Sequence, residues 1–448
     1  IKILYKGVKK VFIKKSHLII ETTFNQILEL RPYCYQLING IEKEISCNYI
    51  LKNNILSFEL GDYDKTLPVV IDPALIFSTY TGSTADNWGF TACNDLLGNV
   101  YAGGIVYQMG YPVSLGAYQT VSGGGWDIGI IKYDSSGINR LYATYLGGSS
   151  TDIPHSIVVN KANQLLILGT TGSSDYPVKS NAYDTSFSGG TNIALDNVLQ
   201  YPNGSDIVVS KLSTDGSQLL ASTFIGGSGN DGLNFLPHYN NMLMFGNDTL
   251  YYNYGDGVRG EIITDNQNNV YVGTCTFSTD FPGTSNGFQT SNNGKQEGIV
   301  FKMDFNLTNL IWSSYLGGSE NDAIYSIDNN SDYDVYVTGG TTSLNFPTTN
   351  GAYKTSYQGG SADGFISRIS QNGNILKASS YFGSNKYDQS YFVRIGKDNN
   401  VFITGQTRAD SNILIYNAPF NVPNSGQFIT KIKPNLDSLI WSTVVGTG

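Results

Sequence analysis

The stretch LIWSSYLGGSEND, residues 310–322, decides the fold of this chain, because closely similar stretches recur along the sequence. Each stretch combines an apolar run that ends in an aromatic residue, a glycine-rich turn and a final aspartate. Five copies of so long a motif indicate an internal repeat, which has to be interpreted before any single motif. The copies end at the following aspartates: Asp86, Asp152, Asp231, Asp322 and Asp388.

Each copy contains four short strand-like pieces separated by Asn, Asp and Gly, the residues that turns between strands require. In the fourth copy the pieces include LIWSSY at 310–315, DVYVTG at 334–339 and DGFISR at 363–368. Five full copies are followed by the start of a sixth at Val444. Four short strands per unit predict the four-stranded blades of a β-propeller, in which each sheet buries its faces against neighbouring sheets. A β-helix is the less favoured alternative.

The composition also favours an all-β fold. The 448 residues include 51 glycines and 31 tyrosines, which suit tight turns and half-buried pleated surfaces, and only 14% are charged. A net charge of −9 makes the chain acidic, so nucleic acid is a poor candidate partner because phosphates would be repelled. No apolar run reaches the roughly 18 residues of a membrane span, so we expect no membrane insertion by this chain.

Residues 75–448 resemble a known family. The aromatic-Leu-Gly-Gly-Ser turn, the VYVTG run, FPTTNGAY at 346–353 and an acidic residue five positions before Lys or Arg are similar to the SBBP repeat. This repeat is named for a seven-bladed β-propeller and occurs in bacterial secreted and surface proteins. The resemblance implies a propeller fold and an extracellular or cell-surface location, and it brings no catalytic residues. The fifth copy departs from the pattern, since Gly426 replaces the acidic residue.

Residues 1–74 are expected to form a short β-rich domain ahead of the propeller. LRPYCYQLING at 30–40 and LPVVIDPALIFSTY at 67–80 are similar to the C-terminal part of an uncharacterised β-rich domain that commonly precedes such propellers. The front of that domain is expected to be missing here. The lysines of this segment alternate with apolar residues, which favours the solvent-facing side of strands over a binding patch.

Two cysteines of this segment flank a predicted hairpin turn at 39–42. In that register Cys34 and Cys47 face each other across two antiparallel strands. A cross-strand disulfide would then be geometrically feasible and would indicate an oxidising compartment. Two buried free thiols are the equally favoured alternative.

Two inserts fall on one rim of the predicted propeller, because alternate loops of antiparallel blades leave from the same edge. The larger lies between Asp231 and Val270, and the smaller occupies residues 191–205. Variable loops on a rigid scaffold commonly form binding sites, although a self-packed loop is the favoured interpretation of the larger insert. Its aromatic and histidine side chains are the candidate ligands for a neutral sugar or a partner protein: Phe235, His238, Tyr239, Tyr251, Tyr252 and Tyr254.

The five motif aspartates recur in every copy, which argues against a single catalytic role. Each carboxylate is expected to accept backbone N–H groups of its glycine-rich turn. Calcium coordination is the alternative, since hard cations bind several carboxylate and carbonyl oxygens together, and no other cofactor is expected. A second set of acids begins the fourth strand-like piece and admits the same two interpretations: Asp127, Asp206, Glu297 and Asp363.

Enzyme signatures are scarce. The sequence has three histidines and no GxSxG, HExxH or P-loop pattern, although a glycosidase needs only two suitably spaced carboxylates. We therefore predict a non-enzymatic structural, adhesive or partner-binding module of a secreted or cell-surface bacterial protein. Its partner would be a protein or a surface glycan, and it would belong to a longer chain or an assembly. The alternative is a carbohydrate-binding or carbohydrate-cleaving propeller that uses the insert-bearing face.

Overall fold

The computed structural model is all-β in the residues that it describes. The chain divides into two compact units, one of Ile1–Ser78 with Gly396–Asp398 and one of Thr79–Ile395 with Asn399–Gly448. Among the described residues no helix has the length and hydrophobicity needed to cross a membrane. The structure describes residues 1–22, 26–72, 78–195, 199–234, 250, 257–410 and 412–446.

The first unit contains three three-stranded sheets, with the strand orders β1-β8-β7, β2-β3-β4 and β6-β5-β9. Alternate residues of its strands are buried, as in β3, where Leu18 and Ile20 enter a small core with Val11 and Leu56. The strands of this unit are β1 (Lys2–Leu4), β2 (Lys10–Lys14), β3 (His17–Glu21), β4 (Gln26–Glu29), β5 (Tyr33–Ile38), β6 (Ile41–Ile45), β7 (Cys47–Lys52), β8 (Ile55–Leu60) and β9 (Val70–Asp72).

The register around the two cysteines differs from the one that the sequence suggested. The chain turns between β5 and β6 at Asn39 and Gly40, which have φ angles of 55° and 78°, as a two-residue hairpin turn requires. Cys34 consequently pairs with Ile45, so the expected cross-strand pairing of Cys34 with Cys47 was wrong. Cys47 begins β7, and both residues are buried free thiols in one small core.

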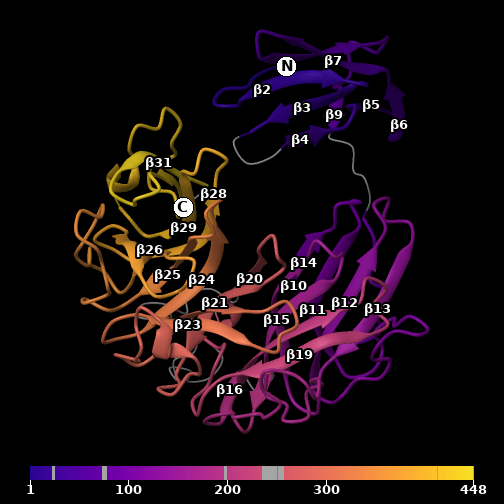
Figure 1. Ribbon diagram of the computed structural model, residues 1–448. Coiled ribbons are helices and arrows are strands. Elements are labelled where there is room, and N and C mark those ends of the chain that lie inside the picture. The colour runs from indigo at the N-terminus through magenta and orange to yellow at the C-terminus, as the bar shows by residue number, and fades with distance from the viewer. Residues whose placement is uncertain are drawn as a thin grey trace. The chain divides into compact units, whose positions relative to one another are not determined.

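The second unit is a β-propeller of five four-stranded antiparallel sheets, which Figure 1 shows side by side in chain order from purple to yellow. We number these sheets blade 1 to blade 5. In each blade the strands follow one another from the inner to the outer edge. The strands are β10 (Asn87–Asn94), β11 (Val100–Tyr107), β12 (Trp126–Tyr133) and β13 (Arg140–Leu146) in blade 1; β14 (Asp152–Val159), β15 (Leu165–Thr171), β18 (Asp206–Leu212) and β19 (Leu219–Ile225) in blade 2; β20 (Glu261–Thr264), β21 (Val270–Thr276), β22 (Glu297–Met303) and β23 (Leu310–Leu316) in blade 3; β24 (Asp322–Asn329), β25 (Val335–Thr341), β26 (Asp363–Ile369) and β27 (Leu376–Phe382) in blade 4; and β28 (Asp388–Ile395), β29 (Val401–Thr407), β30 (Gln427–Ile432) and β31 (Leu439–Val445) in blade 5.

A few short elements lie between these strands. The smaller insert forms a hairpin of β16 (Ile193–Leu195) and β17 (Leu199–Tyr201) between the second and third strands of blade 2. Two 3-10 turns, η2 (Thr284–Asn286) and η3 (Asn412–Leu414), belong to the corresponding connections of blades 3 and 5.

Each blade takes its outer strand from the next copy of the sequence repeat. The LIWSSY run lies in β23, which pairs with β22 of blade 3. The run that contains Val444 lies in β31 and likewise completes blade 5. The all-β propeller of four-stranded blades is therefore confirmed, and each blade ends one strand later than the repeat that begins it.

Neighbouring blades pack face to face. The inner strand of one blade lies against the strands of the preceding blade, as β28 does against β24, β25 and β26. The core between blades 4 and 5 joins Tyr336 and Ile366 of blade 4 to Ile403 and Phe428 of blade 5. Because apolar side chains of neighbouring sheets interlock in this way, the stability of each sheet depends on the sheets beside it.

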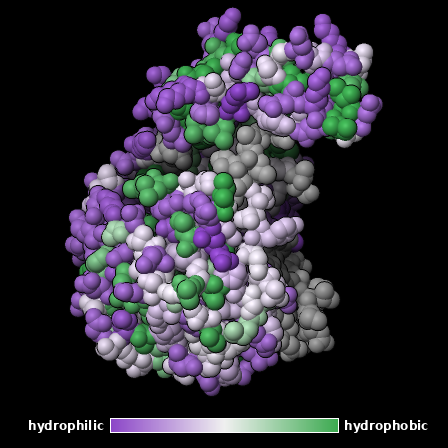
Figure 2. Space-filling model, turned by 90° about the vertical axis from the view of Figure 1, so that its right-hand side faces the viewer, coloured by the Kyte–Doolittle hydropathy of each residue, from purple (hydrophilic) through white to green (hydrophobic). Residues whose placement is uncertain are grey.

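Blade 5 differs in burial from blades 2 to 4, whereas in blade 1 the third strand β12 is buried and the inner strand β10 is largely exposed. In β18 and β22 of blades 2 and 3, every residue is buried. In β30 of blade 5, buried and exposed positions alternate, so one face of the sheet remains exposed. Equivalent side chains show the difference, since Ile366 in blade 4 is 0% exposed and Ile429 in blade 5 is 36% exposed. On the side of the propeller seen in Figure 2, hydrophobic side chains lie scattered in small groups.

Candidate functional site

The inner strands of all five blades line one central cavity of about 610 Å³. Its walls come from β10, β14, β20, β24 and β28 and from the residues directly before β20. A cavity of this size is in the usual range of small-molecule sites. The side chains that give it chemical character are Phe90, Cys93, His155, Arg259, Glu261, Tyr325, Asp328, Phe392 and Arg394.

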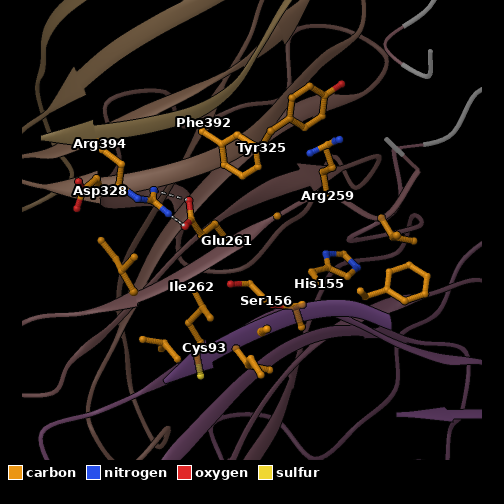
Figure 3. A pocket seen from close by; sticks show the side chains of 18 of the residues that line it. Cys93, His155, Ser156, Arg259, Glu261, Ile262, Tyr325, Asp328, Phe392 and Arg394 are labelled. Carbon is orange, nitrogen blue, oxygen red and sulfur yellow. Dashed lines mark hydrogen bonds and ion pairs between the residues drawn. The ribbon is translucent and has the colours of Figure 1, made fainter. Parts of the chain in front are cut away.

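An ion pair lies on one side of this cavity, as Figure 3 shows. Arg394 of blade 5 donates to Glu261 of blade 3, with Nη2 2.5 Å from Oε1 and Nη1 3.2 Å from Oε2. Ser326 Oγ of blade 4 also donates to Glu261 Oε2 at 2.5 Å, and Ile327 N donates to the same oxygen at 3.0 Å. Glu261 therefore links three blades through four hydrogen bonds.

The second carboxylate of the cavity, Asp328, is likewise engaged. Its Oδ2 accepts the backbone N–H of Ile395 at 2.8 Å, and its Oδ1 accepts the N–H of Asn329 at 2.9 Å. Burial raises the pKa of Asp328, while these hydrogen bonds and the charge of Arg394 oppose the rise. Both carboxylates of the site are thus held by internal donors from neighbouring strands.

A stack of an arginine and two tyrosines forms another part of the wall. The Arg259 guanidinium carbon lies 4.2 Å from the ring centre of Tyr391 and 5.9 Å from that of Tyr325. The two tyrosine rings are themselves 5.8 Å apart. A guanidinium beside aromatic faces is held in a fixed plane, which leaves its N–H groups in a defined direction.

A buried polar network centres on the carbonyl oxygen of Leu250. It accepts hydrogen bonds from Tyr325 OH at 2.8 Å, Asn234 Nδ2 at 2.9 Å and Gln389 Nε2 at 3.2 Å. Gln296 Nε2 extends the network by donating to Asn234 Oδ1 at 2.7 Å. Leu250 belongs to the larger insert, so this residue of the insert is fixed against strands of blades 4 and 5.

The cavity has a histidine and a cysteine, and both are uncharged at neutral pH. Burial lowers the pKa of His155 to about 3, and its Nε2 lies 2.8 Å from Thr170 Oγ1. Burial raises the pKa of the Cys93 thiol to about 12. Neither group has the pKa that a general base or a thiolate nucleophile needs at pH 7.

The candidate ligand residues of the larger insert cannot be placed. Phe235, His238, Tyr239, Tyr251, Tyr252 and Tyr254 lie outside the described residues. Leu250, which lies between these residues in the sequence, has a defined position, because its carbonyl oxygen accepts a hydrogen bond from Tyr325 OH.

The motif aspartates are separated, one at the start of each blade, rather than gathered into one cluster. Asp152, for example, is fully buried and accepts hydrogen bonds from Gly148 N at 2.8 Å and Ser173 Oγ at 3.0 Å. Asp231, Asp322 and Asp388 occupy the same buried position, whereas Asp86 is exposed. No group of three or more His, Cys, Asp or Glu residues suited to a metal ion occurs among the described residues.

The residues that line the cavity were not singled out from the sequence. Arg259, Glu261 and Arg394 lie on or next to inner strands that were treated as ordinary alternating runs. These charged positions are not repeated from copy to copy, so the repeat pattern gave no sign of them. The available signal was that a charged residue interrupts the apolar side of an inner strand.

Comparisons with known proteins add one family match. Residues 1–74 match a domain of unknown function, DUF7948. The match lies within the first unit. Among curated proteins the comparison finds no match.

Similar solved structures are distant. A protein of unknown function from Dyadobacter fermentans is 12% identical with a TM-score of 0.38, covering 83% of this chain and 85% of that one. A mutant of the NanB sialidase from Streptococcus pneumoniae is 10% identical with a TM-score of 0.39, covering 95% and 74%. An exo-1,5-α-L-arabinanase from a bovine ruminal metagenomic library is 11% identical with a TM-score of 0.28, covering 83% and 100%. TM-scores below 0.5 assign no activity to this chain.

Proposed function

We propose that the propeller binds a carbohydrate in its central cavity and does not cleave it. The observation that carries the proposal is the convergence of five inner strands on one cavity with both aromatic and hydrogen-bonding side chains. Aromatic faces pack against the apolar side of a sugar ring, and fixed polar groups orient its hydroxyls. Phe90 and Phe392 would supply the faces, and Arg259 would supply oriented donors.

The state of the carboxylates supports binding over hydrolysis. Glycoside hydrolysis needs one carboxylic acid that protonates the leaving oxygen and a second carboxylate that attacks or activates water. Glu261 is paired with Arg394, and both oxygens of Asp328 accept backbone N–H groups. A carboxylate held in this way would have to break internal hydrogen bonds before it could act on a substrate.

The partner and the location follow from the same proposal. A surface glycan suits the cavity, and the resemblance of residues 75–448 to SBBP repeats supports an extracellular or cell-surface site of action. Binding of a protein partner at the insert-bearing rim remains the alternative prediction. The larger insert would then supply the contacts, with the cavity serving only the packing of the inner strands.

A glycan array followed by calorimetry tests the proposal. We expect a bound glycan, and we expect Phe392→Ala to weaken its binding at least tenfold, because this half-exposed ring faces the cavity. Leu344→Ala is the matched control, since Leu344 is an exposed apolar residue of blade 4 outside the cavity lining, and its affinity should equal that of the unaltered protein.

Two outcomes would contradict the proposal. A chain that binds no glycan on the array, or one whose binding is indifferent to Phe392→Ala, does not use the cavity for sugars. Release of a chromophore from aryl glycosides, if it is abolished by Glu261→Gln, would instead establish the carbohydrate-cleaving alternative.

A further inference from the structure

Two buried carboxylates converge on one glycine turn at each of the four boundaries between successive blades. One acid begins the third strand of a blade, and the other begins the inner strand of the next blade. A Cβ atom placed on Gly226 would lie 2.6 Å from Asp231 Oδ2 and 2.8 Å from Asp206 Oδ1. The four turns and their acids are Gly147 with Asp127 and Asp152, Gly226 with Asp206 and Asp231, Gly317 with Glu297 and Asp322, and Gly383 with Asp363 and Asp388.

At the first boundary, one carboxylate oxygen is left without a hydrogen-bond partner. Asp127 is fully buried; its Oδ2 accepts hydrogen bonds from Ser122 Oγ at 2.5 Å and Gly123 N at 3.0 Å. Its Oδ1 has no hydrogen-bond partner and points into the turn that Asp152 also approaches. Two ionised carboxylates at such a distance in a buried place repel each other unless a positive charge joins them.

At the fourth boundary the chain supplies that positive charge itself. AYKT at 352–355 places Lys354 where the other copies have Gln119, Asp184 and Gln289. Lys354 Nζ donates to the Gly383 carbonyl at 2.6 Å, and its charge favours the ionised forms of the two acids there.

The other boundaries have no such ammonium. At the third, Gln289 Nε2 donates to Glu297 Oε2 at 3.3 Å, so a neutral amide takes the place of the lysine. At the second boundary the equivalent residue is Asp184, and its charge adds to that of Asp206. The same structural position therefore holds a cation in one copy and no positive charge in three.

We propose that each of the three boundaries without the lysine binds a divalent cation such as Ca²⁺, in the role that the Lys354 ammonium has at the fourth. Each pair offers two carboxylates beside the carbonyl groups of a glycine turn, which are the oxygen ligands that Ca²⁺ takes. No third carboxylate, His or Cys joins a pair among the described residues, so carbonyl oxygens and water complete the coordination.

A shared proton is the competitor for the same place. A carboxylate must be deprotonated to bind a metal ion, so a proton and a cation exclude one another at each pair. Calcium binding should consequently strengthen as pH rises.

Equilibrium dialysis of the chelator-treated full chain against radioactive CaCl₂ at pH 8 tests the proposal. We expect saturable uptake of three ions per chain and a melting temperature that rises with CaCl₂. Asp127→Asn should reduce the uptake to two, and Lys354→Gln should increase it to four. Asp437→Asn, which removes an exposed carboxylate outside every pair, should leave it at three.

Asp127→Asn should lower calcium uptake and Lys354→Gln should raise it. If one of these variants fails to fold, the other still tests the proposal. Uptake that is absent, or that is the same in Lys354→Gln and the unaltered chain, overturns the proposal. A melting temperature that falls as pH rises and is indifferent to CaCl₂ at every pH would show that the pairs share protons and would also overturn it.

Discussion

Blades 2 to 4 bury both faces of their sheets, whereas blade 5 exposes one face and blade 1 exposes most of its inner strand β10. Strand lengths are similar in all five blades apart from the short β20, because turns and β-forming residues act locally. The burial of the side chains differs, as the fully buried β22 and the alternating β30 show. The sequence of each copy thus determines where its strands form. Whether both faces of a sheet are buried depends on the blades beside it.

The largest effect is expected from breaking a buried ion pair within one blade. This change tests whether the blades also differ in contacts that do not reach a neighbouring blade. Lys302 pairs with Asp265 at 3.4 Å in blade 3, and Lys132 pairs with Asp95 at 3.6 Å in blade 1; all four side chains are buried. Asp265→Asn should cost about 3–5 kcal/mol of unfolding free energy, because it leaves a buried lysine without its partner. Asp95→Asn should cost about the same, since the Lys132–Asp95 pair lies within blade 1. Lys132 Nζ also donates to the Thr214 carbonyl of blade 2 at 3.3 Å, and this hydrogen bond stays in the variant.

Urea denaturation of the two variants provides the measurement. A clearly smaller loss for Asp95→Asn would extend the difference between end and interior blades to contacts within a blade. Lys295, whose ion pair with Glu320 is exposed, provides a control, and Glu320→Gln should change stability by less than about 1 kcal/mol.

A second prediction compares equivalent core positions directly. Ile366→Ala in blade 4 should cost about 2–5 kcal/mol, because the side chain packs against blade 5. Ile429→Ala in blade 5 should cost about 1 kcal/mol, because over a third of its side chain already contacts solvent. Equal losses in thermal or urea unfolding would mean that the exposed face of blade 5 is covered in solution.

A third prediction concerns pH. The folded-state pKa of Asp231 is raised by burial to about 8, above the ordinary value near 4 of the unfolded chain. In calcium-free buffer, the contribution of Asp231 to stability should therefore be fully present below pH 4 and should fall as pH rises to about 8, by roughly a few kcal/mol. Asp231→Asn should flatten the profile, which a series of melting temperatures would record.

Asp86 is the matched control for that experiment. It ends the same motif at the start of blade 1, but it is exposed. Asp86→Asn should leave the pH profile unchanged. A profile that responds equally to both substitutions would contradict the assignment of the pH dependence to the boundaries between blades.

The smallest effect is expected at the ion pair in the cavity wall, which joins Arg394 of blade 5 to Glu261 of blade 3. A double-mutant cycle of Arg394→Ala and Glu261→Gln should give a coupling of about 0.5–1 kcal/mol, because Arg394 is 48% exposed and solvent screens the pair. A coupling near zero would show that the inner strands of blades 3 and 4 hold blade 5 without this contact.

Much of the fold could be predicted from the repeated motif alone. Glycine-rich turns and alternating apolar runs act within a few residues, so the strands and their number per blade were predictable. The blade boundary was not, because a repeat has no marked starting point and the pairing of β23 with β22 depends on the third dimension.

The cavity was not predictable for a related reason. Arg394 and Glu261 are 133 residues apart and occur on non-adjacent blades. The two residues come into contact because the five sheets curve around the cavity, and no local sequence pattern predicts that curvature. The cysteine register was wrong because one two-residue turn at Asn39 and Gly40 displaces every pairing that follows it.

Each blade ends one strand later than the sequence copy that begins it. This offset affects how the number of blades can change during evolution. Because every outer strand is contributed by the following copy, a duplication of one copy length at any interior point would supply a full sheet, whichever phase the break has. Unequal crossing-over between gene segments can thus lengthen or shorten the array without a matching of breakpoints to structural edges. Natural selection would then act on the two outermost surfaces, where each added unit changes what is displayed to solvent.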